Sequence, residues 1–305
     1  MSCSYKRPLA PASMALALSL SWPADAVVAE QPLMGQTAAA TSSVKTSNVP
    51  AVPDWSKVAD GHALVPVIDF ARKEQEYLRD TVRDFTCRLT KRERIHGILQ
   101  DYNYIDMWVR EEQRNERGLA TPLSIYMQFL APKNVAGRRV LFVDGRNDNK
   151  LLVRNGGKHF DYVVVEIDPH GETAMDESLV PVTQSGFNQI LAQMIAVLER
   201  HVAVDPSGRN TEVQQINGAK LNERPCSVIR ITHPTTQPGL EFHRANVFVD
   251  DALHVPVRVD YTDWPRKPGG EAPLIAEYTY SELQVNVGLP DSVFNPHRLR
   301  GAAAK

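Results

Sequence analysis

The chain has 305 residues, of which 43% are hydrophobic and 23% are charged, so it is long enough to bury a sizeable core. Its formal net charge at pH 7 is -2, from 34 basic and 36 acidic side chains. A balance so close to zero gives no electrostatic basis for binding nucleic acid or for strong adhesion to an anionic membrane.

The first residues have the pattern of a secretory signal peptide. Lys6 and Arg7 precede a short apolar run, and small residues that suit cleavage follow, ending at Ala26 or Ala29. The apolar run is shorter than the ~20 residues of a membrane-spanning helix, and no later segment is apolar enough to span a membrane. We therefore expect residues 1–26 to be removed and the mature protein to be soluble, in the periplasm or elsewhere outside the cytoplasm.

Residues 27–62 are predicted to form a disordered tether ahead of one folded domain. The stretch is rich in alanine, serine, threonine and proline and shows no apolar period, so it buries too little surface to offset ordering. Residues 63–297 are expected to form the single domain. Residues 298–305 end in Ala-Ala-Ala-Lys and are expected to fray.

The domain opens with a predicted amphipathic helix over residues 65–82, in which Ile68 and Leu78 share one face. The pattern then changes to a period of two over residues 85–95, which indicates a long strand with one buried and one wet face. The side chains expected on the buried face are Phe85, Cys87, Leu89 and Ile95, and those on the wet face are Thr86, Arg88, Thr90, Arg92 and Arg94.

Further segments of strand character follow, separated by turn-forming residues, and a second amphipathic helix over residues 187–202 divides them into two groups. Short turns favour antiparallel neighbours. The plan is therefore α+β, with helices on one face of a large antiparallel sheet. The predicted strands cover residues 102–111, 123–130, 139–143, 150–154, 160–167, 211–217, 227–232, 245–250, 255–261 and 274–287.

Three segments carry a resemblance to the bacterial family called domain of unknown function 1571. They are residues 85–97 (with 123–132 and 137–140 behind them), residues 247–261 and residues 277–289. The second segment, Val-Phe-Val-Asp-Asp-Ala-Leu-His-Val-Pro-Val-Arg-Val-Asp-Tyr, is also similar to a strand–turn–strand signature of the outer-membrane lipoprotein carrier and lipoprotein-sorting superfamily. The resemblance implies a strongly curved antiparallel sheet, an incomplete β-barrel, covered by amphipathic helices that leave a space for acyl chains.

The residues that would line such a cavity follow from the apolar faces of the predicted strands and of the second helix. Ordinary core packing is the competing interpretation for each of them. The candidates on the sheet are Phe85, Leu89, Ile105, Met107, Val109, Ile125, Met127 and Phe129, and those on the helix are Ile190, Met194 and Leu198.

Cys87 and Cys226 are the cysteines that follow the predicted signal peptide. In an oxidising compartment they could pair as a disulfide, or they could stay as two buried thiols. Both alternatives stay open, because the sequence does not give their separation in space.

A search for catalytic patterns finds no nucleophile elbow, zinc-binding helix pair, phosphate loop or C-x-x-C pair. We therefore expect no enzyme activity, no cofactor and no metal. The basic run Lys91-Arg-Glu-Arg94, with Arg110, Arg114 and Arg117, could bind an anionic head group or a partner. Because Glu93, Glu111, Glu112 and Glu116 are interleaved with these residues, we interpret them as the wet side of long strands.

Two functional classes remain. One is an exported soluble carrier or chaperone that binds a lipid or a lipoprotein acyl chain between sheet and helices, with an envelope protein as receptor. The other is a non-catalytic interaction module of the cell envelope with a filled core. An open apolar cavity distinguishes the two, because only the carrier needs one.

Overall fold

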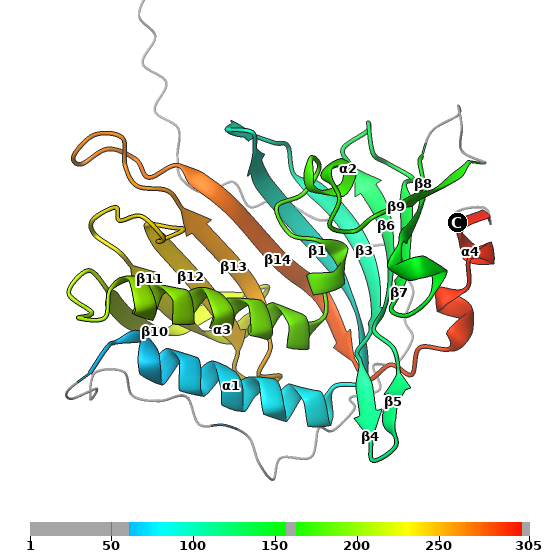
Figure 1. Cartoon of the computed structure of the whole chain (residues 1–305), viewed down its shortest axis with the longest axis horizontal. Coiled ribbons are helices and arrows are strands. Elements are labelled where there is room, and N and C mark those ends of the chain that lie inside the picture. The colour runs from blue at the N-terminus through cyan, green and yellow to red at the C-terminus, as the bar shows by residue number, and fades with distance from the viewer. Residues whose placement is uncertain (1–49, 51–60, 157–162, 301–305) are drawn as a thin grey trace, which may run out of the picture. The chain divides into compact units, whose positions relative to one another are not determined.

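The computed structural model describes residue 50, residues 61–156 and residues 163–300. The predicted signal peptide and nearly all of the predicted tether lie outside these residues. The described strands form one curved antiparallel sheet of 12 strands and a separate two-stranded hairpin, with helices against the concave face (Figure 1). The first and last strands of the sheet order do not pair, so the sheet is not closed into a barrel. The expected α+β class is confirmed.

The sheet order is β10-β11-β12-β13-β14-β1-β3-β6-β7-β8-β9, with β2 beside β1. Each predicted strand has an observed counterpart, with ends that differ by a few residues. The strands of the main sheet are β1 (Asp84–Ile95), β2 (Ile98–Leu99), β3 (Asn103–Arg110), β6 (Ser124–Ala131), β7 (Arg139–Val143), β8 (Leu151–Arg154), β9 (Val164–Ile167), β10 (Glu212–Leu221), β11 (Arg224–Thr232), β12 (Arg244–Asp250), β13 (Pro256–Thr262) and β14 (Leu274–Val285).

The sheet is made of two meanders that meet at its middle. Neighbours in sequence pair along β1 to β9 and again along β10 to β14, and the two halves join where β14 pairs with β1. Leu89 lies opposite Tyr280 in this central pair. The order places β9 and β10 at opposite edges, so the chain between them must cross the face of the sheet.

The two long helices lie side by side on the concave face (Figure 1). They are α1 (Leu64–Thr81) and α3 (Phe187–Val204), close to the predicted bounds. The apolar stripe of α3 packs through Ile195 and Leu198 against α1 and against strands β11 and β12. Helix α3 is therefore both a cover for the sheet and the crossing connection from one edge to the other.

Several short elements have no counterpart among the predictions, because they are too short for a periodic signal. The hairpin of β4 and β5 leaves the main sheet after β3. Helix α2 and a 3-10 turn lie between β9 and α3. The bounds are β4 (Gln113–Asn115), β5 (Gly118–Thr121), η3 (Asn147–Asn149), α2 (Glu172–Met175), η4 (Val182–Gln184), η5 (Asp291–Phe294) and α4 (His297–Arg300).

The last described residues, which form α4, pack on the outer face of the sheet and extend past the predicted domain boundary at residue 297. Leu299 in α4 is fully buried in a cluster with Tyr126 and Leu141. The Arg298 guanidinium lies 4.6 Å from the ring centroid of Trp108 and 4.2 Å from that of Tyr126. The expectation of a frayed tail from residue 298 is therefore wrong for residues 298–300, because an apolar side chain anchors them.

The burial of Leu299 leads to a measurable expectation. Leu299→Ala should lower the free energy of unfolding by about 2–3 kcal/mol, because a fully buried leucine loses its contacts and leaves a cavity. Leu119→Ala, on the exposed β5, should change it by less than about 0.5 kcal/mol. Urea titrations of the two variants test this, and equal small effects would contradict the anchoring of α4.

Candidate functional site

A cavity of about 1080 Å³ lies between the concave face of the sheet and the helices α1 and α3. Its walls come from both halves of the sheet and from residues 173–185, here called the covering segment, which lies in the connection between β9 and α3. Pockets for small molecules mostly measure about 300–1,000 Å³. The cavity is therefore large enough for an extended apolar ligand.

The sheet wall is apolar because inward side chains of neighbouring strands stand in rows. Leu89 on β1 lies opposite Ile105 on β3, which in turn lies opposite Phe129 on β6. Met127 lies opposite Val140 on the next strand. A period of two puts every second side chain of each strand on this face, so the rows repeat along the strands.

The structure divides the predicted lining residues into two sets. The cavity wall contains Leu89, Ile105, Met127, Phe129, Ile190, Met194 and Leu198. The closed core contains Phe85, Met107, Val109 and Ile125, each of them at most 1% exposed.

The second set is closed off by the start of α3. Phe187 stacks on Phe85 with ring centroids 4.3 Å apart, and Val109 and Ile125 continue the row of Phe85 across the sheet. Space toward the other ends of the same strands stays open. Strand alternation predicts on which face of the sheet a side chain lies. The position of α3 decides whether that side chain is in the closed core or in the cavity wall.

Parts of the wall were not among the predicted residues. The strands β11 to β13 contribute Ile229, Val247 and Val259, and the covering segment contributes Leu179 and Val180. The strands had an apolar face in the sequence, so their contribution follows once they are known to share the sheet. The covering segment had no periodic signal, although Leu179 and Val180 are apolar residues within a polar stretch.

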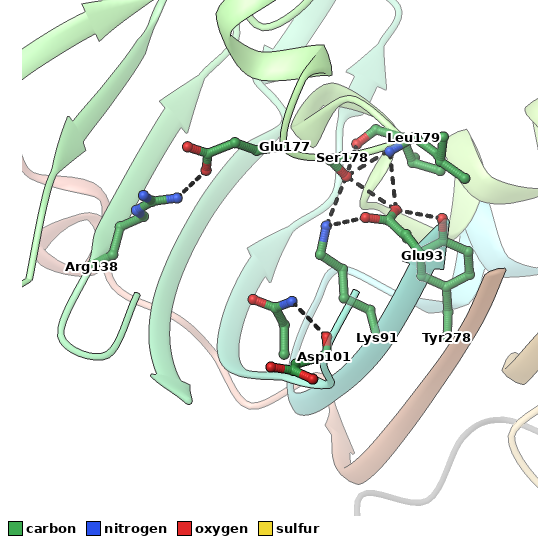
Figure 2. A network of polar contacts seen from close by, with 10 residues as sticks. Lys91, Glu93, Asp101, Arg138, Glu177, Ser178, Leu179 and Tyr278 are labelled. Atoms are coloured by element: carbon green, nitrogen blue, oxygen red, sulfur yellow. Dashed lines mark hydrogen bonds and ion pairs between the residues drawn. The ribbon is translucent and has the colours of Figure 1, made fainter. Parts of the chain in front are cut away.

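A partly buried polar network ties the covering segment to the sheet (Figure 2). The carboxylate of Glu93 accepts hydrogen bonds from Lys91 Nζ at 2.7 Å, Tyr278 OH at 2.6 Å and the Leu179 backbone N–H at 3.2 Å. The hydroxyl of Ser178 accepts from Lys91 Nζ at 2.8 Å and donates to Glu93 at 3.2 Å. Two of these groups come from the covering segment, so the network closes that side of the cavity.

The interpretation of the charged run as a wet strand face is wrong for Lys91 and Glu93. Both side chains are on the inner face, with 12% and 3% exposed. They have odd numbers like Phe85, Cys87 and Leu89, so the same alternation places them inside. The signal was present in the sequence and was masked by the charge of the residues.

Glu111 also lies inside, where it holds the start of α3. Its carboxylate accepts a hydrogen bond from the Phe187 backbone N–H at 2.6 Å, and its side chain is fully buried. A Cβ atom at Gly186 would lie 2.8 Å from its second oxygen, so only glycine fits there without movement. Burial raises the pKa of Glu111 to about 7, although hydrogen bonds from Phe187 and Asn188 oppose the shift.

Both cysteines are buried free thiols in the structure, so the disulfide alternative is not realised. Cys87 is on β1 and Cys226 on β11, four strands apart in the sheet order. At about 4.8 Å per strand they are about 19 Å apart along the sheet, and a disulfide needs Cα atoms within about 7 Å. Burial raises the pKa of the Cys87 thiol, which keeps it protonated and unreactive.

Within residues 61–156 and 163–300, no group of three or more His, Cys, Asp or Glu side chains is placed to hold a metal ion. The longest helices in the same part of the chain are too polar or too short to cross a membrane. The polar groups that face the cavity include those of the network, several ion pairs around it and uncharged side chains such as Asn134 and Gln193.

Comparison with solved structures finds distant likeness over about three quarters of the chain. A DUF1329 family protein from Desulfovibrio piger ATCC 29098 is similar with 13% identity and a TM-score of 0.38, covering 76% of this chain and 97% of that one. The Pseudomonas aeruginosa MucA/MucB complex is similar with 11% identity and a TM-score of 0.42, covering 76% and 62%. A putative outer membrane lipoprotein-sorting protein domain from Vibrio parahaemolyticus is similar with 11% identity and a TM-score of 0.28, covering 77% and 98%.

No curated protein matches the chain. The model of the family described as protein of unknown function (DUF1571) matches residues 82–299, which include every strand of the sheet and helix α3. This match covers more than two thirds of the sequence and agrees with the resemblance seen in residues 85–97, 247–261 and 277–289. The chain belongs to the DUF1571 family.

Proposed function

We propose that this protein is an exported carrier that holds an acyl chain of a lipid, or of a lipidated protein, in the cavity between sheet and helices. The observation that supports it is a cavity of about 1080 Å³ with apolar side chains on the sheet and on α3. Burial of an acyl chain contributes about 0.8 kcal/mol for each methylene removed from water. Reversible burial needs no covalent step, so the proposal assigns no catalytic residue.

The cavity also favours the carrier over an interaction module with a filled core. In such a module the stripe of α3 would pack fully against the sheet, as its Phe187 and Ile195 do. Met194 and Ile190 lie on the same helix and instead face the cavity, half-buried. A large apolar wall left uncovered costs free energy unless a ligand covers it.

Entry and release require part of the wall to move. The covering segment is the obvious part, because polar contacts with Glu93, His96 and Arg138 hold it in place. Hydrogen bonds of this kind can exchange with water at little net cost, whereas the packed helices cannot separate so easily. In this proposal, a receptor in the envelope would act by displacing the covering segment.

Met194→Glu should abolish lipid binding, because it places a carboxylate in the middle of the apolar wall. The measurement is mass spectrometry of solvent extracts from protein purified without detergent, together with titration of a neutral fluorescent probe. The wild type is expected to carry acyl lipid in an amount nearly equal to that of the protein. The variant's affinity for the probe is expected to be lower by more than about tenfold.

Leu119→Glu is the matched control, since it adds the same charge on the exposed β5 away from the cavity. It should bind like the wild type. Thermal unfolding shows whether each variant keeps its fold. A wild type that contains no lipid and does not bind the probe would contradict the carrier function and leave the interaction module as the function.

A further inference from the structure

Charged side chains surround the apolar cavity, and those that carry positive charge are all neutralised. Every Lys, Arg and His in the described part of the wall is hydrogen-bonded to an Asp or Glu carboxylate. The pairs are Lys91 with Glu93 (2.7 Å), His96 with Asp176 (3.2 Å), Arg200 with Glu241 (2.6 Å), His254 with Glu74 (3.2 Å) and Arg138 with Glu177.

The innermost pair is fixed on several sides. The Glu93 carboxylate accepts hydrogen bonds from Lys91, from Tyr278 and from two groups of the covering segment. It therefore cannot turn away and leave the Lys91 ammonium unpaired. Burial raises the pKa of Tyr278 well above its ordinary value, so the phenol remains a donor to that carboxylate. An anionic ligand would have to compete with a buried, fully hydrogen-bonded carboxylate for Lys91.

The remaining charge in the wall is negative. Asp101 is an exposed residue of the cavity wall and has no ion pair within the described residues. Moving an ionised carboxylate from water to an apolar site without a counter-ion costs several kcal/mol. The cavity therefore offers an anionic head group no unpaired positive charge to offset its loss of water.

Lys91 still offers a neutral ligand one contact. Its ammonium has three N–H donors, and the described partners, Glu93 and Ser178, use two of them (Figure 2). The third can donate to an ester carbonyl or a hydroxyl oxygen at the end of an acyl chain. Such an acceptor keeps the pair with Glu93 intact and adds no charge.

We propose that the cavity selects acyl lipids whose polar end is uncharged, such as glycerol esters, over ionised fatty acids with the same chain. This inference rests on the proposed carrier function and names the class of ligand that the carrier takes. The observation that supports it is that each basic side chain of the described wall is paired with a carboxylate, while Lys91 keeps a donor for a neutral oxygen.

The test compares monooleoylglycerol with oleate at about pH 8, where a carboxylic acid of ordinary pKa is ionised. Each lipid displaces the neutral probe phenylnaphthylamine from the full mature chain, below its aggregation concentration. Monooleoylglycerol is expected to bind at least about tenfold more tightly. Equal or tighter binding of oleate overturns the inference and leaves the carrier standing, whereas failure of both lipids to displace the probe overturns the carrier and the inference together.

A variant that frees one cation tests the physical reason. Glu177→Gln removes the partner of Arg138 and lies at a side chain that is 59% exposed, so the fold should tolerate it. The affinity for oleate relative to that for monooleoylglycerol should then rise about tenfold, because only the ionised ligand gains from the freed guanidinium, whereas a loosened covering segment affects both lipids alike. Glu116→Gln, on the exposed turn after β4, removes the same charge outside the wall and should change neither. If Glu177→Gln leaves the affinity for oleate relative to that for monooleoylglycerol unchanged, as the control should, charge neutralisation is not the basis of selection.

Discussion

Phe187→Ala is expected to lower the free energy of unfolding by about 3–5 kcal/mol, the range for removal of a buried phenylalanine. Phe187 is fully buried, stacks on Phe85 and lies 6.0 Å from Tyr280 between ring centroids. These partners belong to β1 and β14, where the two halves of the sheet join. The ring therefore fixes the start of α3 to the middle of the sheet, and urea titration followed by circular dichroism measures its loss.

Phe129→Ala is the matched control, because this ring is only partly buried and faces the cavity. One side of it already lacks packed neighbours, so truncation removes fewer contacts and creates no new enclosed space. Its effect should be less than about half that of Phe187→Ala. Comparable losses for the two variants would mean that the cavity wall is as tightly packed as the core.

The second large effect is on the pH dependence of the free energy of unfolding, to which Glu111 makes one of two opposite contributions. Burial raises the pKa of Glu111 from 4.5 to about 7 in the folded chain. Between these values the folded chain keeps a proton that the unfolded chain has lost, so stability falls as pH rises. The total is about 3 kcal/mol over this window.

His233 makes the opposite contribution. It is fully buried, with Nε2 2.9 Å from Nδ1 of His201, and burial lowers its pKa from 6.5 to about 4. Between these values the unfolded chain binds a proton that the folded chain rejects, so stability falls as pH falls. This contribution is also about 3 kcal/mol and largely cancels that of Glu111.

The contribution of each group should be visible in the difference in free energy of unfolding between a single variant and the wild type, measured as a function of pH. The stability of Glu111→Gln relative to wild type should rise by about 3 kcal/mol from about pH 4.5 to 7, because only the wild type has the Glu111 contribution that falls in this window. His233→Gln should show the mirror image, gaining on the wild type from about pH 6.5 down to 4. Denaturant titrations at several pH values give both curves, and a flat difference for either variant would exclude that group.

Much of the fold could be predicted from local patterns in the sequence. The period of two in residues 85–95 gave β1 with its inner face, and the spacing of Phe187, Leu191 and Leu198 gave α3. These segments are long, and one face of each is buried, so apolar periodicity is strong. Short elements such as α2 lack enough residues to show a period.

The site could be predicted only in part, for two physical reasons. Which end of a strand lines the cavity depends on where α3 begins, and that follows from tertiary packing, as Phe85 and Leu89 on one strand show. Charge in a strand sequence also indicates an exposed side chain, and here that indication is misleading. Lys91, Glu93 and Glu111 follow the same alternation as their apolar neighbours and lie inside, because each has a buried partner there.

The joining of β14 to β1 has a consequence for how the chain folds. These strands are neighbours in the sheet but are separated by most of the domain in sequence, from Asp84 to Val285. Contacts between such distant segments make folding slow. Until β14 has been synthesised and has docked, β1 presents an unpaired edge that another strand could join. A chain cut short before Leu274 should therefore aggregate, and the intact chain depends on protection of that edge until its last long strand arrives.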